Sequence, residues 1–119
     1  MELRGGMGHD GESCAALTAV FALLGKRWSG LIIGILLSGP ARWTELARQV
    51  HGVSERMLSC RLNELTAAGL IERRVLPGPP VGVEYRLTER GEALRPALDE
   101  LGRWATEHLR AGVDSLDRS

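Results

Sequence analysis

The chain has few of the residues that would support catalysis, metal binding or a disulfide framework. It holds two cysteines, Cys14 and Cys60, and three histidines in 119 residues. The histidines lie far apart, and none stands at ligand spacing from a cysteine or a carboxylate. The cysteines form no Cys-x-x-Cys pair, and we find neither a phosphate-binding glycine loop nor a nucleophile triad. The sequence therefore predicts no enzyme, no cofactor and no metal site.

Long apolar runs and an excess of one charge are also missing. The run over residues 31–37 is far too short to cross a bilayer, and the glycine-rich start of the chain has no signal-peptide segment. We therefore expect a cytoplasmic protein with no membrane contact, whose two thiols stay reduced. The formal net charge is zero, which argues mildly against nucleic-acid binding.

The length allows one domain with one modest core. We expect a disordered tail over residues 1–12, a folded domain over 13–111 and a frayed C-terminus over 112–119.

The segment that carries the most information is a predicted helix over residues 54–68. Ser54 can cap its start by accepting a hydrogen bond from a free backbone N–H, and Gly69 can close it in the left-handed conformation. Leu58, Leu62 and Leu65 fall at helical spacing and predict a buried stripe. The opposite face then consists of Arg56, Ser59, Cys60 and Asn63.

Arginine and asparagine are the side chains that bond bidentately to guanine and adenine in the major groove. The alternative is that these residues are only the solvated face of a surface helix. The neighbouring segments favour DNA. Residues 43–50 predict a short helix, 51–53 a glycine-containing turn, and 71–76 with 83–87 a hairpin across a proline-rich loop.

On these residues the chain resembles the HxlR-type group of winged-helix transcriptional regulators in the MarR-like class. The resemblance implies an α+β fold, a winged helix-turn-helix that is mostly helical, with a two-stranded β-hairpin wing and flanking dimerisation helices. The sequence departs from the family pattern at two positions. Gly82 stands where a basic residue is usual, and Cys60 stands where glutamine is frequent. The matching residues are Cys14, 25–28 (with Arg27 inserted), 39–46 (with Trp43 for phenylalanine), Ser54, 57–59, 61–62, 64–65, 69–70, Arg73, 83–85, 87–88, Gly91 and Trp104.

The charge distribution is consistent with a DNA-binding surface in the middle of the chain. Residues 42–86 hold seven arginines and five glutamates, whereas residues from 87 onward hold five arginines and seven acidic residues. We expect double-stranded DNA to be bound by Arg42, Thr44, Ser54, Arg56, Met57, Ser59, Cys60, Arg61, Asn63, Arg73, Arg74 and Arg86.

The remaining predicted helices favour a homodimer. Residues 15–24 and 92–109 each carry an apolar stripe, and 28–37 is apolar nearly all round, as in a buried central helix. A small domain has little to cover both stripes, so a second copy is the expected partner; packing of the last helix on the first is the alternative. The expected dimerisation residues are Leu17, Val20, Phe21, Leu94, Leu98, Leu101 and Trp104.

Cys14 near the start of the first helix is a candidate sensor. Helix N-termini favour a thiolate, and the family resemblance implies that the equivalent cysteine senses thiols or electrophiles in some members. The alternative is a small buried side chain. The sequence thus predicts a homodimeric DNA-binding regulator. We expect it to be a repressor that responds to thiol oxidation or to a small ligand. The alternative function is a winged helix that binds protein instead of DNA.

Overall fold

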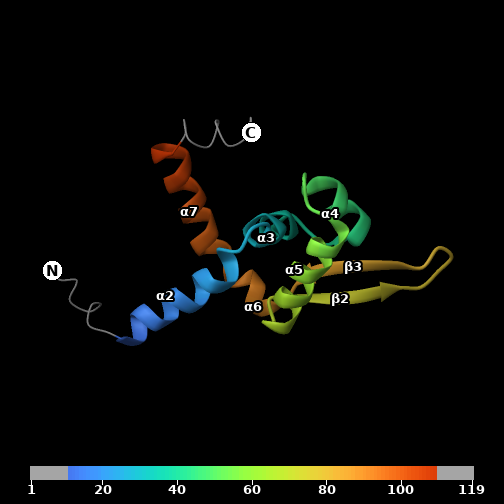
Figure 1. The fold of residues 1–119 in the computed structure, drawn as a ribbon, viewed down its shortest axis with the longest axis horizontal. Coiled ribbons are helices and arrows are strands. Elements are labelled where there is room, and N and C mark those ends of the chain that lie inside the picture. Colours follow the sequence, from blue (N-terminus) through green and yellow to red (C-terminus); the bar gives the residue numbers. More distant parts are fainter. Residues whose placement is uncertain (1–10, 110–119) are drawn as a thin grey trace.

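The computed structural model describes residues 11–109, which form six helices and three strands; two of the helices, α2 and α7, lie at the outside of the molecule (Figure 1). The order of elements confirms the α+β winged helix-turn-helix. The elements are α2 (Gly11–Leu24), α3 (Ser29–Leu37), β1 (Ala41–Arg42), α4 (Trp43–Gln49), α5 (Glu55–Ala67), β2 (Ile71–Leu76), β3 (Gly82–Leu87), α6 (Glu89–Glu92) and α7 (Arg95–His108).

The sheet has three antiparallel strands in the order β1-β3-β2, so the expectation of a two-stranded hairpin was incomplete. The added strand β1 pairs Ala41 with Tyr85 and Arg42 with Glu84. Two residues are too short a run to show a strand pattern. Only the return of β3 beside them supplies the partner.

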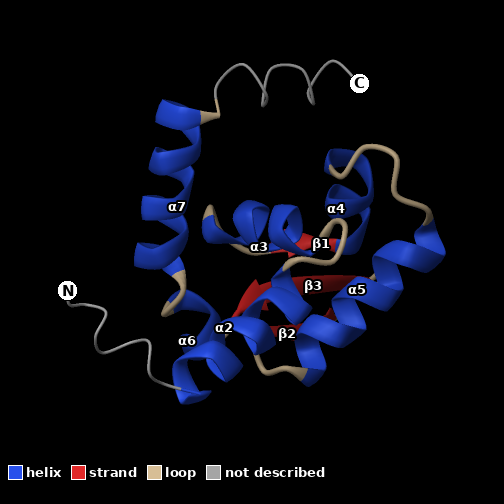
Figure 2. Cartoon of the chain, turned by 60° about the vertical axis from the view of Figure 1, so that its left-hand side comes forward, coloured by secondary structure: helices blue, strands red, loops and turns tan. Residues whose placement is uncertain are grey.

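The core lies between the sheet and helices α3, α4 and α5, and Figure 2 shows α7 standing apart from it. Leu58, Leu62 and Leu65 of α5 are fully buried, which confirms the predicted stripe. The central helix α3 buries Ile32, Ile33 and Leu36. Its Leu31, expected to face inward, is 48% exposed, because only one side of α3 meets the sheet and α5.

Helix α5 begins and ends as its sequence predicts. The Met57 N–H donates to Ser54 Oγ at 3.0 Å, which is an N-cap. Gly69 has φ of 79°, and its N–H donates to the Thr66 carbonyl while the Leu70 N–H donates to the Leu65 carbonyl. This pair of bonds is a Schellman motif, and it turns the chain directly into β2.

The last helix predicted over residues 92–109 is confirmed as α7 over Arg95–His108, but the short helix α6 that precedes it was not predicted. Thr88 caps the separate short helix α6 by accepting from the Gly91 N–H at 3.1 Å, and α7 begins three residues after α6 ends. Pro96 lies in the first turn of α7, where its missing N–H costs no helical bond. The break redirects α7 away from the sheet.

Helices α2 and α7 project from the same end of the body, opposite the hairpin (Figure 1), and neither buries a residue. Helix α2 includes Gly11 and Glu12 of the predicted N-terminal tail; the rest of both predicted tails lies outside the described residues. Within residues 11–109 no single helix is long and apolar enough to span a membrane. The pair α2 and α3, bent by 85°, meets that test jointly by length and composition alone.

Candidate DNA-binding interface

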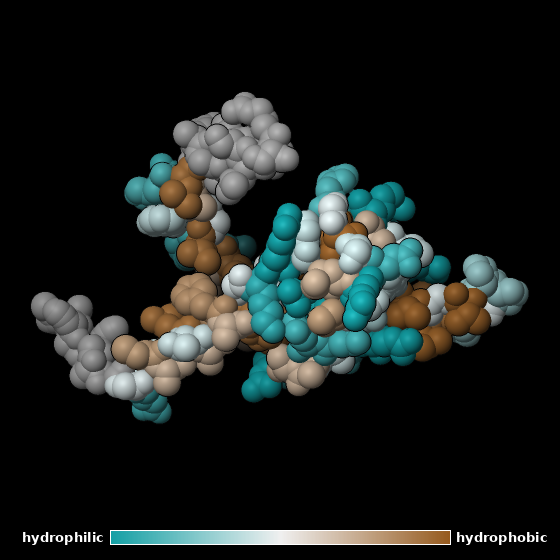
Figure 3. Space-filling model, viewed as in Figure 1, coloured by the Kyte–Doolittle hydropathy of each residue, from teal (hydrophilic) through white to brown (hydrophobic). Residues whose placement is uncertain are grey.

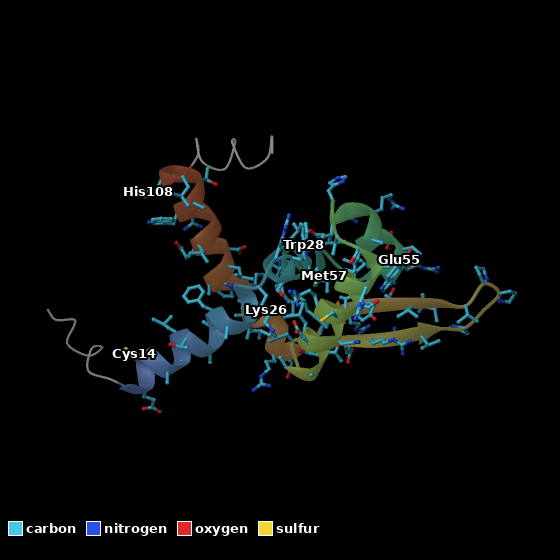
Figure 4. The ribbon with its side chains drawn as sticks, viewed as in Figure 1. Cys14, Lys26, Trp28, Glu55, Met57 and His108 are labelled. Atoms are coloured by element: carbon cyan, nitrogen blue, oxygen red, sulfur yellow. The ribbon has the colours of Figure 1, made fainter. Side chains whose placement is uncertain are left out.

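The exposed face of α5 carries the predicted base-contacting side chains. Arg56, Cys60 and Asn63 are exposed, and Ser59 is half-buried beside them. Met57 also reaches this surface and is half-buried (Figure 4). The buried leucine stripe fixes the rotation of α5 and so presents these residues to solvent together. An α-helix with such a free face fits the major groove of B-DNA.

Arg61, expected among these residues, lies elsewhere. Its Nε donates to the carbonyl oxygen of Arg27 at 2.9 Å, and its Nη1 lies 3.1 Å from Glu64 Oε1. The side chain is only 15% exposed. These bonds commit the guanidinium to the turn between α2 and α3, so the structure gives Arg61 a structural position instead of a place on the DNA-facing side.

The start of α4 lies against the hairpin. Arg42, Thr44 and residues 80–83 line a shared hollow of about 400 Å³. The backbone N–H of Arg42 donates to Glu45 Oε1 at 2.8 Å, which holds the first turn of α4. A Cβ placed on Gly82 would lie 3.2 Å from Arg42 Nη1. The guanidinium of Arg42 therefore occupies the place that a side chain at 82 would take, and it supplies positive charge where the wing has glycine.

The arginines of the hairpin do not form one patch. Successive residues of a strand point to opposite faces, so Arg73 and Arg74 lie on different sides of β2. Arg74 is opposite Glu84 and Arg86 is opposite Glu72, with Arg86 Nε 3.1 Å from Glu72 Oε2. The far end of the hairpin is apolar: Val75 is 53% and Val81 70% exposed. Arg42 on β1 is likewise opposite Glu84.

Sequence reasoning missed an ion pair between α5 and the turn that joins α2 to α3. Lys26 Nζ lies 3.2 Å from Glu64 Oε2, and the hydrogen bond from Lys26 is the main reason that the pKa of Glu64 falls below its usual value. The Sγ of Cys60 lies 3.9 Å from the same carboxylate oxygen. The lysine is in the Gly-Lys-Arg-Trp element, but nothing in the sequence pairs it with a residue 38 positions away.

The expected dimerisation residues divide into two groups. Leu17, Phe21, Leu101 and Trp104 are about half exposed or more, and Figure 3 shows apolar surface along both outer helices. Trp104 stacks on His108 with ring centroids 5.1 Å apart. Leu94 and Leu98 instead pack partly against the chain's own core, and Val20 is half-buried.

The two thiols are both exposed, and Cys14 lies on α2 near the outer end (Figure 4). Exposure contradicts the alternative of a small buried side chain at Cys14. Residues 11–109 contain no group of three or more histidine, cysteine or acidic residues placed to hold a metal ion.

Comparison with known proteins places the chain in a family. The family model described as HxlR-like helix-turn-helix matches residues 23–112. The transcriptional regulator YodB of Bacillus subtilis (strain 168) is 43% identical over 99 residues, which cover 83% of this chain and 88% of YodB. The uncharacterised regulator YvaP of the same organism is 41% identical over 101 residues, covering 85% of this chain and 94% of YvaP.

Solved structures agree in fold. Reduced YodB from B. subtilis superposes with a TM-score of 0.71 at 44% identity, covering 78% of this chain and 91% of YodB, and a quinone-bound form gives 0.69 at 41%, covering 77% and 96%. The redox regulator HypR in its oxidised form gives 0.72 at 30% identity, covering 78% of this chain and 96% of HypR. The chain therefore belongs to the HxlR-like helix-turn-helix family of transcriptional regulators.

Proposed function

We propose that the chain acts as a homodimer that binds a specific double-stranded DNA sequence, with α5 in the major groove. The observation that carries this is the exposed face of Arg56, Cys60 and Asn63 on a helix whose other side is fully buried. The start of α4 and the adjoining hairpin would contact the flanking phosphates through Arg42, which lies beside Gly82. We place this DNA binding in the cytoplasm.

The dimer would form through the two outer helices. Their exposed apolar residues have no cover within the described chain, and a second copy supplies an identical pair of helices. Helix-turn-helix dimers place their recognition helices about 34 Å apart, one turn of B-DNA. Dimerisation therefore supports specific binding as well as stability.

DNA binding is tested by fluorescence anisotropy with two duplexes. One is the duplex that the protein selects from a random pool, and the other has the same composition in scrambled order. The proposal expects tighter binding to the selected duplex, with affinity that falls as salt rises. If no duplex is selected and low-salt binding to random DNA is absent, the winged helix binds protein instead.

Thiol chemistry at Cys14 is the proposed signal, and repression released by that signal is the proposed outcome. The support is the exposed position of Cys14 on α2, together with relatives solved with quinone and in an oxidised form. The sulfur would add to a ring carbon of the quinone, so that an S–C bond forms as the ring C=C π bond breaks. The thiol proton moves to one ring oxygen, and the hydrogen of the attacked carbon then moves to the other oxygen, giving an S-substituted hydroquinone. The added bulk would stand beside the proposed dimer contact.

Benzoquinone titration of wild type, Cys14→Ser and Cys60→Ser tests this step. We expect wild type and Cys60→Ser to lose affinity for the selected duplex, while Cys14→Ser keeps it. If Cys60→Ser alone is protected, the sensor is Cys60. Equal loss in all three proteins would assign the signal to another group.

A further inference from the structure

The turn between α2 and α3 contacts α5, the proposed recognition helix, at two points, and an ion pair within α5 links them. Lys26 Nζ lies 3.2 Å from Glu64 Oε2, Arg61 Nη1 lies 3.1 Å from Glu64 Oε1, and Arg61 Nε donates to the Arg27 carbonyl at 2.9 Å. Glu64 thus binds one cation from the turn and one from its own helix, and Arg61 bonds back to the turn. We name Lys26, Arg27, Arg61 and Glu64 the α2–α5 joint.

The same turn also contacts the helix-turn-helix from the other side. Trp28 adopts φ of 81°, which is unusual for a residue other than glycine and persists where surrounding contacts hold it. A Cβ on Gly52 would lie 3.4 Å from Cη2 of Trp28, so the indole packs against the turn before α5. The Arg27 guanidinium lies 4.4 Å from the centroid of the indole ring. The turn therefore contacts the segment before α5 as well as the third turn of α5.

Helix α2 contacts the body at its C-terminal end, where Leu23 and Leu24 are half-buried against the core. It buries no residue completely, and its C-terminal end passes directly into the joint, where the Gly25 N–H donates to the Phe21 carbonyl at 2.8 Å. A Cβ at Gly25 would clash with that carbonyl oxygen, so the tight turn at the end of α2 requires glycine. Figure 4 shows Lys26 beside α5 and Cys14 near the far end of α2. A change in the direction of α2 would therefore act on Lys26 and Arg27 together with the packing of Leu23 and Leu24 on the core.

We propose that the α2–α5 joint transmits the direction of α2 to the recognition helix, with Glu64 as the positioning residue that holds both cations. Glu64 acts on DNA binding through the orientation of α5 and makes no contact with DNA itself. In the proposed dimer, α2 belongs to the interface, so the joint sets how each recognition helix stands relative to its partner. This inference rests on the proposed function only for its consequence on DNA.

The joint is tested without DNA by measuring the distance between α2 and α5. Spin labels are attached at Glu12→Cys on α2 and at Glu55→Cys on α5, in a Cys14→Ser, Cys60→Ser background. Labelled protein is diluted with unlabelled protein to isolate distances within one chain. The intact joint should give one narrow distance distribution. Glu64→Gln and Lys26→Met should each broaden it, whereas Lys26→Arg, which keeps the charge, should preserve it.

The control is Glu89→Gln on α6, which removes the same charge from an exposed carboxylate outside the joint. It should leave the distribution narrow. Lys26 is 47% exposed, so far-UV circular dichroism should show a folded chain in its variants. Unchanged widths in Glu64→Gln and Lys26→Met would overturn the joint, and equal broadening in Glu89→Gln would reduce it to a general effect of charge.

The consequence for DNA is tested with the selected duplex and the same duplex carrying two inserted base pairs between its half-sites. Wild type should lose about tenfold or more in affinity on insertion, because a fixed pair of helices tolerates one spacing. Glu64→Gln should bind the parent duplex less tightly and lose only about threefold or less on insertion, since its helices can adjust. A loss as large as in wild type would contradict transmission. A wild type that selects no duplex would reject the proposed function, leaving the distance measurement to decide on the joint.

Discussion

The body and the outer helices of this molecule differ in how they cover apolar surface. All twelve buried hydrophobic residues of the described chain lie between Ile32 and Tyr85, where helices α3 to α5 pack on the sheet. Helices α2 and α7, with fourteen residues each, bury none, although they carry Leu17, Phe21, Leu101 and Trp104. The body therefore buries its apolar side chains within one chain. The outer helices leave these four side chains about half exposed or more, which is the reason for proposing a second copy as their partner.

The largest effect should come from opening the core of the body. Leu62→Ala removes a fully buried side chain and should lower the free energy of unfolding by about 2–5 kcal/mol. Urea unfolding followed by circular dichroism measures it. Leu101→Ala on α7 is the control, and at low protein concentration it should cost far less. If both variants lost the same free energy of unfolding, the body and the outer helices would not differ in packing.

Dimerisation is the next test of the comparison. Leu101→Asp places a charge in the proposed interface, where an unpaired polar group costs roughly 2 kcal/mol or more. Sedimentation should show a shift from dimer to monomer at micromolar concentration with an unchanged helical signal. Thr106→Asp, at another exposed position of α7, should stay dimeric. A wild-type monomer would reject the interface outright.

The DNA-facing side of the body should respond more weakly, and only toward specific DNA. Arg56→Ala and Asn63→Ala should each cost about 1–3 kcal/mol on the selected duplex if they contact base edges. Binding to random duplex should change less. Anisotropy titrations on both duplexes measure the difference, with Arg103→Ala on α7 as the control. Equal losses on both duplexes would reassign these residues to phosphate contacts.

The smallest effect concerns the pairing of Arg42 with Gly82. Arg42→Ala should reduce the slope of affinity against salt by about one phosphate contact on any duplex. Adding Gly82→Arg to that variant should restore the slope, because the new guanidinium occupies the vacated space. Gly82→Arg alone would bring two guanidinium groups together and should add less than a full contact. If the double variant shows the same salt slope as Arg42→Ala, the two positions do not share one phosphate contact.

The sequence predicted well wherever the cause of a structure is local. Ser54 and Gly69 bound α5 through hydrogen bonds to backbone groups within a few residues, and the leucine stripe depends only on helical spacing. The predictions were wrong or incomplete where the cause is distant. Strand β1 exists because β3 returns beside it, and Arg61 turns away from the DNA-facing side because the Arg27 carbonyl lies within its reach.

The sequence by itself determined the order of the longer helices and of the two hairpin strands, the start and end of α5, and which face of α5 is buried. These follow from spacing and capping, which act over a few residues. Only the tertiary structure decided that Lys26 meets Glu64, that Arg42 fills the space beside Gly82, and that α7 turns away from the core. Such contacts depend on where the folded backbone brings distant residues together, and no local pattern encodes that distance.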